Sequence, residues 1–258
     1  MNKENNNKPK ILFLDIETFP NIGLIWQKYQ QDVLEYVREW IIVAFTVKFL
    51  GDKKSYTYTL PDFKGYKPGK EDDKQLMKKL WEFLDSADIV VGHNCRDFDC
   101  KKANARFLFH GMNSPSPYKI VDTLVEAKKH FNFNSNKLQD LSKYFNLGQK
   151  ANPYGFQLWV GCMKGEPKWW DRMAYYNKTD VELLEKLYLK LLPWMNHPAY
   201  GIYMNKDNVC ASCGSTHLQS RGFTRNKTTK YRRFFCCDCG SWGRDTKNIQ
   251  MVKPIVNI

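Results

Sequence analysis

The sequence predicts an α/β domain followed by a small β-ribbon that is held together by a metal ion. Short apolar runs alternate with segments of helical periodicity along most of the chain, which is typical of a sheet flanked by helices. Two CxxC pairs follow near the C-terminus. With 258 residues, the chain can bury one substantial core and still carry a small appendage.

The first predicted strand is the apolar run ILFL at residues 11–14, which is too short for a helix. Residues 38–51 and 54–60 are expected to form the strands that complete the sheet after it. Residues 71–88 carry apolar side chains at helical spacing, and ADIVVGHN at 87–94 reads as a second buried strand. These elements predict a sheet with helices packed against it.

Four acidic residues lie at the edges of the predicted elements. Asp15 and Glu17 are alternate residues of the first strand, so both side chains point to the same face of the sheet. Asp99 follows the second buried strand, and Asp180 lies on a strong helical pattern, four residues after Tyr176 on the same helix face. Folds of this class place ligands at the carboxyl edge of the sheet, so we expect the three segments to converge on one cleft.

Carboxylates beside an apolar core indicate a bound cation. Ionised carboxylates in such a place are costly unless positive charge is bound near them. Hard divalent cations take carboxylate oxygens, and two of them about 3.5–4 Å apart can clamp the attacking and leaving oxygens of a phosphodiester. A DxE pair on a strand is, taken alone, more often two solvated carboxylates. The four acids together predict a two-metal site.

These residues resemble the three motifs of the DEDD, or DnaQ-like, 3′–5′ exonucleases. The motifs are DIET at 15–18, Asn94 followed by Phe98 and Asp99, and Tyr176-x-x-x-Asp180. A Tyr before the last Asp resembles the DEDDy subgroup. The spacing of the second motif is similar to that of the proofreading domains of family-B polymerases, and other segments resemble predicted phage-encoded exonucleases. The resemblance covers about residues 10–196 and implies an RNase H-like mixed sheet flanked by helices.

The resemblance implies a 3′–5′ exonuclease that hydrolyses phosphodiesters with two Mg²⁺ or Mn²⁺ ions. The ligands of those ions would be the four acids, Asp15, Glu17, Asp99 and Asp180. Tyr176 would orient the attacking water. Thr18 would contact the 3′-terminal nucleotide, and Asn94 and Phe98 would shape the pocket in which the strand end lies.

Two further acidic residues have simpler interpretations as helix caps. Asp97 competes with Asp99 and could instead cap the helix that follows. We favour Asp99 because it follows the aromatic residue Phe98, as the motif requires. Asp122 precedes another helical pattern, so we expect it to be an N-cap rather than a metal ligand.

The expected substrate is DNA, most simply single-stranded 3′ ends, with a replication or repair protein as a possible partner. An RNA 3′–5′ exonuclease is an alternative. A second class of function is a nucleic-acid-binding or recruitment protein in which the same fold no longer cuts. The intact set of four acids favours the enzyme, because little would hold these carboxylates together without metals.

The second strong signal is a set of four cysteines, Cys210, Cys213, Cys236 and Cys239. Each CxxC pair is followed by Gly-Ser, and the Gly permits the tight turn of a zinc knuckle. The four thiolates satisfy one tetrahedral Zn²⁺, and the segment resembles the zinc β-ribbons of transposase-like and other DNA-binding proteins. Cys237 breaks the symmetric spacing and is interpreted as a bystander. His217 is a weaker alternative ligand.

The C-terminal segment is strongly basic. Residues 205–258 contain ten Lys or Arg against three Asp, which supplies +7 of the chain's net charge of +13. Basic and aromatic residues alternate between the two cysteine pairs, and such residues neutralise phosphates and stack on unpaired bases. The basic residues expected to bind nucleic acid are Arg225, Lys230, Arg232 and Arg233. The competing interpretation is a solvated hairpin whose aromatic residues form its own small core.

These signals divide the chain into five parts. We expect a flexible tail at 1–10, the exonuclease domain at 11–196, a linker at 197–209, the zinc ribbon at 210–245 and a tail at 246–258. The longest apolar run, IIVAF, is far shorter than a membrane span, so no membrane contact is expected. Cysteines without a pairing pattern and the lack of a targeting segment predict a reducing compartment, the cytoplasm, or the host cytoplasm for a phage-encoded protein.

Overall fold

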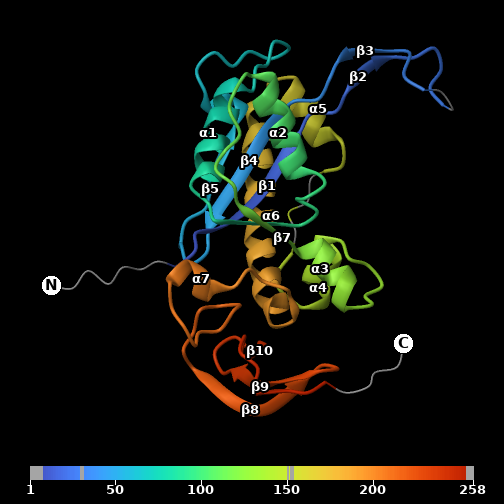
Figure 1. Ribbon diagram of the computed structural model, residues 1–258. Helices are drawn as coiled ribbons and strands as arrows, with labels where there is room; N and C mark the ends of the chain where they lie inside the picture. Colours follow the sequence, from blue (N-terminus) through green and yellow to red (C-terminus); the bar gives the residue numbers. More distant parts are fainter. Residues whose placement is uncertain (1–7, 30–31, 150, 152–153, 254–258) are drawn as a thin grey trace. The chain divides into compact units, whose positions relative to one another are not determined.

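The computed structural model describes residues 8–29, 32–149, 151 and 154–253 (Figure 1). Lys10–Tyr188 forms one compact unit, and the residues from Leu189 onward form most of a second. Most of the expected N-terminal tail, and residues 254–258 of the expected C-terminal tail, lie outside the described residues.

The larger unit is built on a five-stranded mixed sheet. Its strands, in spatial order, are β5 (Tyr56–Thr59), β4 (Ile42–Phe49), β1 (Ile11–Thr18), β6 (Ile89–Gly92) and β7 (Lys119–Asp122). β1 pairs antiparallel with β4 and parallel with β6, and β7 continues the parallel side. The sheet therefore has the mixed topology that the sequence predicts, with β1 in the centre.

Alternation along β1 decides which residues face which layer. The even-numbered residues Leu12 and Leu14 belong to the main hydrophobic core. Phe13 points to the other face, where its ring meets Tyr188 edge-to-face at 5.3 Å between centroids. Side chains of a strand alternate between faces, so Asp15 and Glu17 share the face of Phe13. Asp15 and Glu17 therefore lie on the sheet face that is covered by the helix carrying Tyr188.

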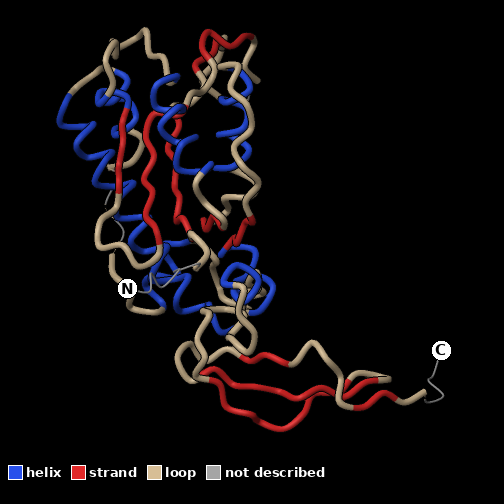
Figure 2. Tube along the Cα trace, turned by 60° about the vertical axis from the view of Figure 1, so that its left-hand side comes forward, coloured by secondary structure: helices blue, strands red, loops and turns tan. Residues whose placement is uncertain are grey.

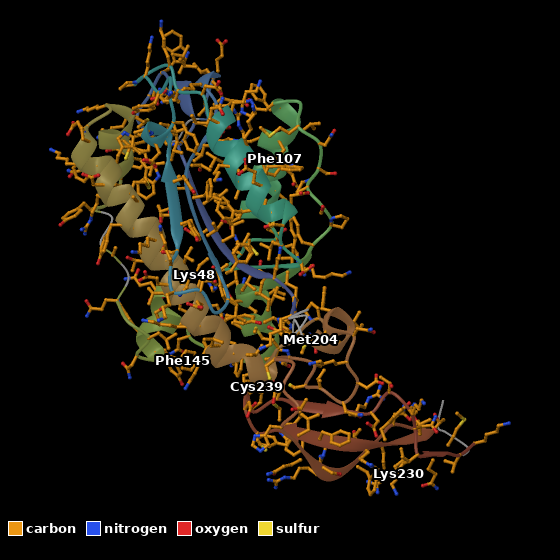
Figure 3. All side chains as sticks on the ribbon, turned by 90° about the vertical axis from the view of Figure 1, so that its left-hand side faces the viewer. Lys48, Phe107, Phe145, Met204, Lys230 and Cys239 are labelled. Atoms are coloured by element: carbon orange, nitrogen blue, oxygen red, sulfur yellow. The ribbon has the colours of Figure 1, made fainter. Side chains whose placement is uncertain are left out.

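Helices cover both faces of the sheet. Those of this unit are α1 (Lys74–Asp85), α2 (Asp99–Phe109), α3 (Thr123–His130), α4 (Leu138–Tyr144), α5 (Gln157–Met163) and α6 (Pro167–Leu191). α1 and α2 lie on one face, and the long α6 crosses the other (Figures 1 and 2). Lys48 of β4 also reaches α6, where its Nζ lies 2.6 Å from Glu185 Oε2 (Figure 3).

A buried ionic network fastens α1 to α2 and β4. Asp73, just before α1, is fully buried and accepts hydrogen bonds from Arg106 at 2.6 and 2.8 Å and from the backbone N–H of Ile42 at 3.1 Å. His110 Nε2 lies 2.6 Å from the same carboxylate. Removing one partner of such a network leaves an uncompensated buried charge, which typically costs about 3–5 kcal/mol.

A hairpin that the sequence analysis does not predict follows β1. β2 (Ile22–Leu24) and β3 (Glu35–Arg38) form a separate two-stranded sheet. Large apolar side chains along the hairpin are exposed, among them Trp26 and Val37. The hairpin lacks the alternation of buried and exposed residues that identifies a strand from sequence.

The second unit contains a small antiparallel sheet. Its strands are β8 (Leu218–Arg225), β9 (Thr229–Cys236), β10 (Trp242–Arg244) and β11 (Gln250–Met251). β9 is central: β8 lies on one side of it, and β10 and β11 lie on the other. The short strand β11 falls inside the expected C-terminal tail, and α7 (Tyr200–Met204) falls inside the expected linker.

Among the described residues, no helix combines the length and the apolar character that a crossing of the bilayer requires.

Candidate active site

Three carboxylates meet where β1 passes under α6. One oxygen from each of Asp15, Glu17 and Asp180 lies within 4.8 Å of the others. Asp15 and Glu17 come from the last half of β1, and Asp180 comes from the middle of α6 and is buried. The structure thus brings together three of the four acids that the sequence singles out, from segments more than 160 residues apart.

Asn177 holds Asp15 in place and was not predicted from the sequence. Its Nδ2 donates to Asp15 Oδ2 at 2.6 Å and lies 3.2 Å from the backbone oxygen of Asp15. The Asn177 side chain is fully buried. Asn177 precedes Asp180 by three residues and therefore shares its face of α6. A polar residue at that spacing on a buried helix face is the signal that could have identified it.

Asp99 begins α2, and its carboxylate lies beside β1. It is buried, and its Oδ1 accepts a hydrogen bond of 2.9 Å from the backbone N–H of Ile16, the residue between Asp15 and Glu17. Among the described residues, Asp99 stands outside the group of three carboxylates within 4.8 Å. Its carboxylate is nevertheless tied to the same short stretch of β1.

Burial disfavours the ionised form of the Asp99 carboxyl. Desolvation raises its pKa to about 7, the hydrogen bond from Ile16 N acts in the opposite direction, and the charge of Asp122 adds to the increase. Asp97 differs: it is exposed, and Lys101 Nζ lies 2.6 Å from its carboxylate, which lowers the pKa of Asp97. The two acids of this segment therefore have opposite environments, and only Asp99 faces β1.

Tyr176 and Tyr175 also lie in different environments. Tyr176 is 8% exposed and contacts Trp159 edge-to-face, with 6.4 Å between ring centroids. Tyr175 is 56% exposed. Since residues four apart share a helix face, Tyr176 lies one turn from Asp180 on the side of the carboxylates.

Thr18, Asn94 and Phe98 lie at the ends of the elements that carry the acids. Thr18 is the last residue of β1, and the register with β4 shifts between Glu17 and Thr18. Asn94 follows β6 with a φ of +71°, a conformation that Asn tolerates better than most residues. Phe98 immediately precedes α2 and is 37% exposed, so its ring is accessible.

Asp122 stabilises the loop that contains Asn94. It caps α3, and its side chain accepts hydrogen bonds from four backbone N–H groups, those of Asn94, Arg96, Leu124 and Val125, at 2.9–3.3 Å. The predicted N-cap is therefore confirmed. Because the cap also fixes the loop before α2, Asp122 helps to set where Asn94 and Phe98 lie.

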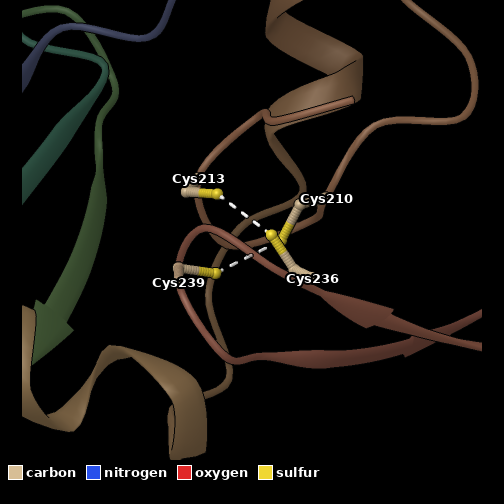
Figure 4. A group of neighbouring side chains, drawn as sticks. All are labelled: Cys210, Cys213, Cys236 and Cys239. Carbon is tan, nitrogen blue, oxygen red and sulfur yellow. Dashed lines mark hydrogen bonds between the residues drawn. The ribbon is translucent and has the colours of Figure 1, made fainter. Parts of the chain in front are cut away.

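The four cysteines of the C-terminal unit form one cluster (Figure 4). Their sulfurs lie within 4.8 Å of one another, with 3.6 Å between those of Cys210 and Cys239 and 3.7 Å between those of Cys213 and Cys236. A tetrahedral zinc with Zn–S bonds of 2.3 Å requires sulfurs about 3.8 Å apart. The spacing of the donors therefore fits one zinc ion. Cys237 is outside the cluster, as expected.

Each CxxC pair closes a turn of the same form. Gly214 N donates to Cys210 O and Gly240 N donates to Cys236 O, each at 2.9 Å. The two glycines have φ values of +73° and +78°, a region in which a side chain would be strained. Burial raises the pKa of Cys210 to about 11, so the thiol is protonated at neutral pH unless a cation is bound.

The four basic residues predicted to bind nucleic acid divide between the two faces of the ribbon. Arg225 lies opposite Lys230, and Arg232 is two residues from Lys230 on the same face. Arg233 alternates with Arg232 and lies opposite Arg244 of β10, on the other face. The sequence identifies the cluster but does not separate the two faces.

Comparison with known proteins agrees with this architecture. The model of the RNase H superfamily matches residues 41–192, more than half of the chain. The protein belongs to the RNase H superfamily, and this membership supports a nuclease function and a nucleic-acid substrate.

The solved structure of the family B DNA polymerase from the hyperthermophilic archaeon Pyrobaculum calidifontis has a similar fold, with a TM-score of 0.51 and 19% sequence identity. The match covers 72% of this chain but only 25% of the polymerase chain. Among curated proteins, none matches the chain.

The raised pKa of Asp99 predicts a pH-dependent stability in the absence of divalent cations. Between pH 5 and pH 8 the folded protein must ionise a carboxyl whose pKa is about 7, whereas the unfolded chain ionises it near pH 3.8. Folding stability should therefore fall as pH rises through this window, by about 3 kcal/mol for this group. Urea unfolding of the protein and of Asp99→Asn, with chelator, measures the difference. Parallel stability curves for the two proteins would contradict the prediction.

Proposed function

We propose that the protein is a metal-dependent 3′–5′ exonuclease that removes nucleotides from the 3′ end of DNA, preferentially single-stranded DNA. The observation that carries the proposal is the convergence of Asp15, Glu17 and Asp180 within 4.8 Å, with Asp99 buried against the same stretch of β1. The catalytic domain would comprise residues 11–196, the boundaries expected from the sequence. A role in replication or repair would follow from such an activity.

The donor set fits divalent cations. Carboxylate oxygens are the preferred ligands of Mg²⁺ and Mn²⁺, and three carboxylates this close repel one another unless positive charge lies between them. Asp15, Glu17, Asp99 and Asp180 would hold two such ions. When bound, the ions would activate a water molecule and stabilise the charge that develops on the leaving 3′ oxygen.

The protein's own groups would orient the reactants. The Tyr176 hydroxyl, one helical turn from Asp180, would accept a hydrogen bond from the attacking water and hold it in line with the terminal phosphorus. Asn177 fixes the orientation of Asp15 through its amide, and Ile16 N fixes Asp99. Attack by the water oxygen on phosphorus breaks the bond to the 3′ oxygen, which leaves with a proton.

Residues at the rim would hold the strand end. Thr18 at the end of β1 would contact the terminal nucleotide, and the exposed ring of Phe98 offers a surface for its base. Asn94, whose loop is fixed by Asp122, would shape the pocket beside it.

The ribbon would bind one structural Zn²⁺ through Cys210, Cys213, Cys236 and Cys239 and increase affinity for nucleic acid. Support comes from the spacing of the four sulfurs and from the basic residues of the ribbon. Neutralising phosphates with Lys and Arg releases counterions, so this contribution should weaken with salt.

Cleavage of end-labelled oligonucleotides tests the proposed activity. With Mg²⁺ or Mn²⁺, a 5′-labelled single strand should shorten stepwise from its 3′ end, and a 3′-blocked strand should not. Asp15→Asn and Asp180→Asn should abolish cleavage, because each removes a charge from the shared site. Asp97→Asn, the matched change at the exposed acid of the same region, should cleave normally. A 3′-labelled strand losing its label last, or an active Asp180→Asn protein, would refute the proposal. Preference for RNA would redefine the substrate.

The two adjacent tyrosines provide a test of the proposed orienting group. Tyr176→Phe should lower kcat by about 10²-fold with little change in KM, the scale usual for a group that handles the reacting proton. Tyr175→Phe removes the same hydroxyl from the exposed neighbour and should leave both constants unchanged. Single-turnover cleavage across a pH series measures the effect. Equal rates for the two variants would exclude this role for Tyr176.

A further inference from the structure

One face of the ribbon carries rings and guanidinium groups side by side. Tyr231, Arg233 and Phe235 are alternate residues of β9 and share a face. In the register with β10, Trp242 lies opposite Phe235 and Arg244 lies opposite Arg233, so they share it too. We call these five residues the Arg–aromatic face. The ribbon extends from the cluster containing Cys239 toward Lys230 (Figure 3).

The side chains of this face form two groups of contacts, Arg244 with Tyr231 and Arg233 with Trp242 and Phe235. The guanidinium of Arg244 lies 3.9 Å from the centre of the Tyr231 ring, and that of Arg233 lies 4.7 Å from the Trp242 ring. The rings of Trp242 and Phe235 follow, with 5.2 Å between their centroids. Each ring therefore touches either an arginine plane or another ring.

The Arg–aromatic face remains accessible and is positively charged. Trp242 is 55% exposed, and Arg233 and Arg244 are exposed as well. Among the described residues of the ribbon sheet, this face carries no Asp or Glu, and neither arginine takes part in a salt bridge. A sheet face whose purpose was only to form a core would bury its largest ring, because burial of apolar area supplies the stabilisation.

The opposite face is organised differently. Phe223, Arg225, Lys230 and Arg232 share it, and Lys230 Nζ lies 4.4 Å from the Phe223 ring. This face also carries two arginines, but the Phe223 ring is in contact with the compact charge of Lys230. The Arg–aromatic face offers the larger exposed ring, Trp242, so it is better suited to planar bases.

We propose that the Arg–aromatic face is a binding site for single-stranded nucleic acid. Unpaired bases would stack on the Trp242 and Tyr231 rings and on the guanidinium planes of Arg233 and Arg244, which would also contact phosphates. In a duplex the bases already stack on one another, so the rings would gain little from it. The inference rests on the proposed function for its substrate, and it assigns the single-strand preference to this face.

Two matched double variants separate this site from general charge. Arg233→Gln with Arg244→Gln removes two charges from the Arg–aromatic face, and Arg225→Gln with Arg232→Gln removes two from the opposite face. Binding to a fluorescent single-stranded 20-mer and to the same sequence as a duplex is measured by anisotropy, in an Asp15→Asn background that prevents cleavage. The first pair should weaken single-strand binding at least tenfold more than the second. Equal losses would overturn the proposal.

The ring contribution is tested with Trp242→Leu and Trp242→Phe. Trp242→Leu should weaken single-strand binding about 5- to 100-fold and leave duplex binding nearly unchanged, on the scale of one stacked base. Trp242→Phe should restore most of the loss. Zinc content equal to that of the parent shows that the ribbon is folded. Unchanged single-strand affinity in a zinc-loaded Trp242→Leu protein, or no recovery with Phe, would show that the face is structural only.

Cleavage of a short oligonucleotide distinguishes this inference from the proposed function. With Asp15 intact, the parent protein is assayed for cleavage of a tetranucleotide beside the binding measurements, because the proposed catalytic groups precede the ribbon and can be tested without it. If the parent cleaves the oligonucleotide but the ribbon variants bind the single strand as the parent does, the binding site is rejected and the nuclease function stands. If the ribbon variants lose single-strand binding but the parent cleaves no substrate, the binding site stands and the nuclease function is rejected.

Discussion

The close approach of three carboxylates at the end of β1 is the constraint on which the arrangement of the larger unit depends. Two unit charges 4.8 Å apart repel by roughly 3 kcal/mol at the effective dielectric of a protein surface. A flexible segment would relieve this repulsion by moving apart. β1 cannot do so, because Asp15 and Glu17 are paired with β4, the preceding residues Ile11–Phe13 are paired with β6, and Phe13 packs against Tyr188 of α6. The sheet thus holds Asp15 and Glu17 beneath Asp180.

Buried hydrogen bonds position the acids further. Asn177 of α6 donates to Asp15 of β1, and Ile16 N of β1 donates to Asp99 at the start of α2. One strand is therefore tied to both helices. The raised pKa of Asp99 follows from this burial, because the ionised carboxylate is unfavourable there when no cation is bound. Cation binding and release of the Asp99 proton would therefore be coupled.

Much of this site was predictable because it depends on short-range rules. Strand alternation gives the shared face of Asp15 and Glu17, the four-residue spacing gives that of Tyr176 and Asp180, and CxxC spacing gives the cysteine cluster. Asn177 was missed because its role is a tertiary contact with Asp15, and helical spacing alone does not distinguish it from a packed polar residue.

The elements that sequence reasoning missed bury few apolar side chains. Their sequences therefore show no clear alternation of buried and exposed residues. The β2–β3 hairpin exposes apolar residues such as Leu24 and Tyr36, and β11 is only two residues long. The two faces of the ribbon depend on the register of β9 with its neighbours, including a bulge between Ser220 and Phe223 that shifts the alternation along β8. Register is a long-range property, so the basic cluster could be identified from the sequence without its division into faces.

Calorimetric titration of Mn²⁺ into the zinc-loaded protein tests the central claim most directly, because it requires no substrate. The account predicts saturable binding of about two Mn²⁺ ions per chain, with release of a proton near neutral pH. Asp180→Asn should lose at least one of the two ions, while Asp97→Asn should bind as the parent does. Binding that is absent, or equally strong in Asp180→Asn, would contradict the assignment of these carboxylates as a metal site.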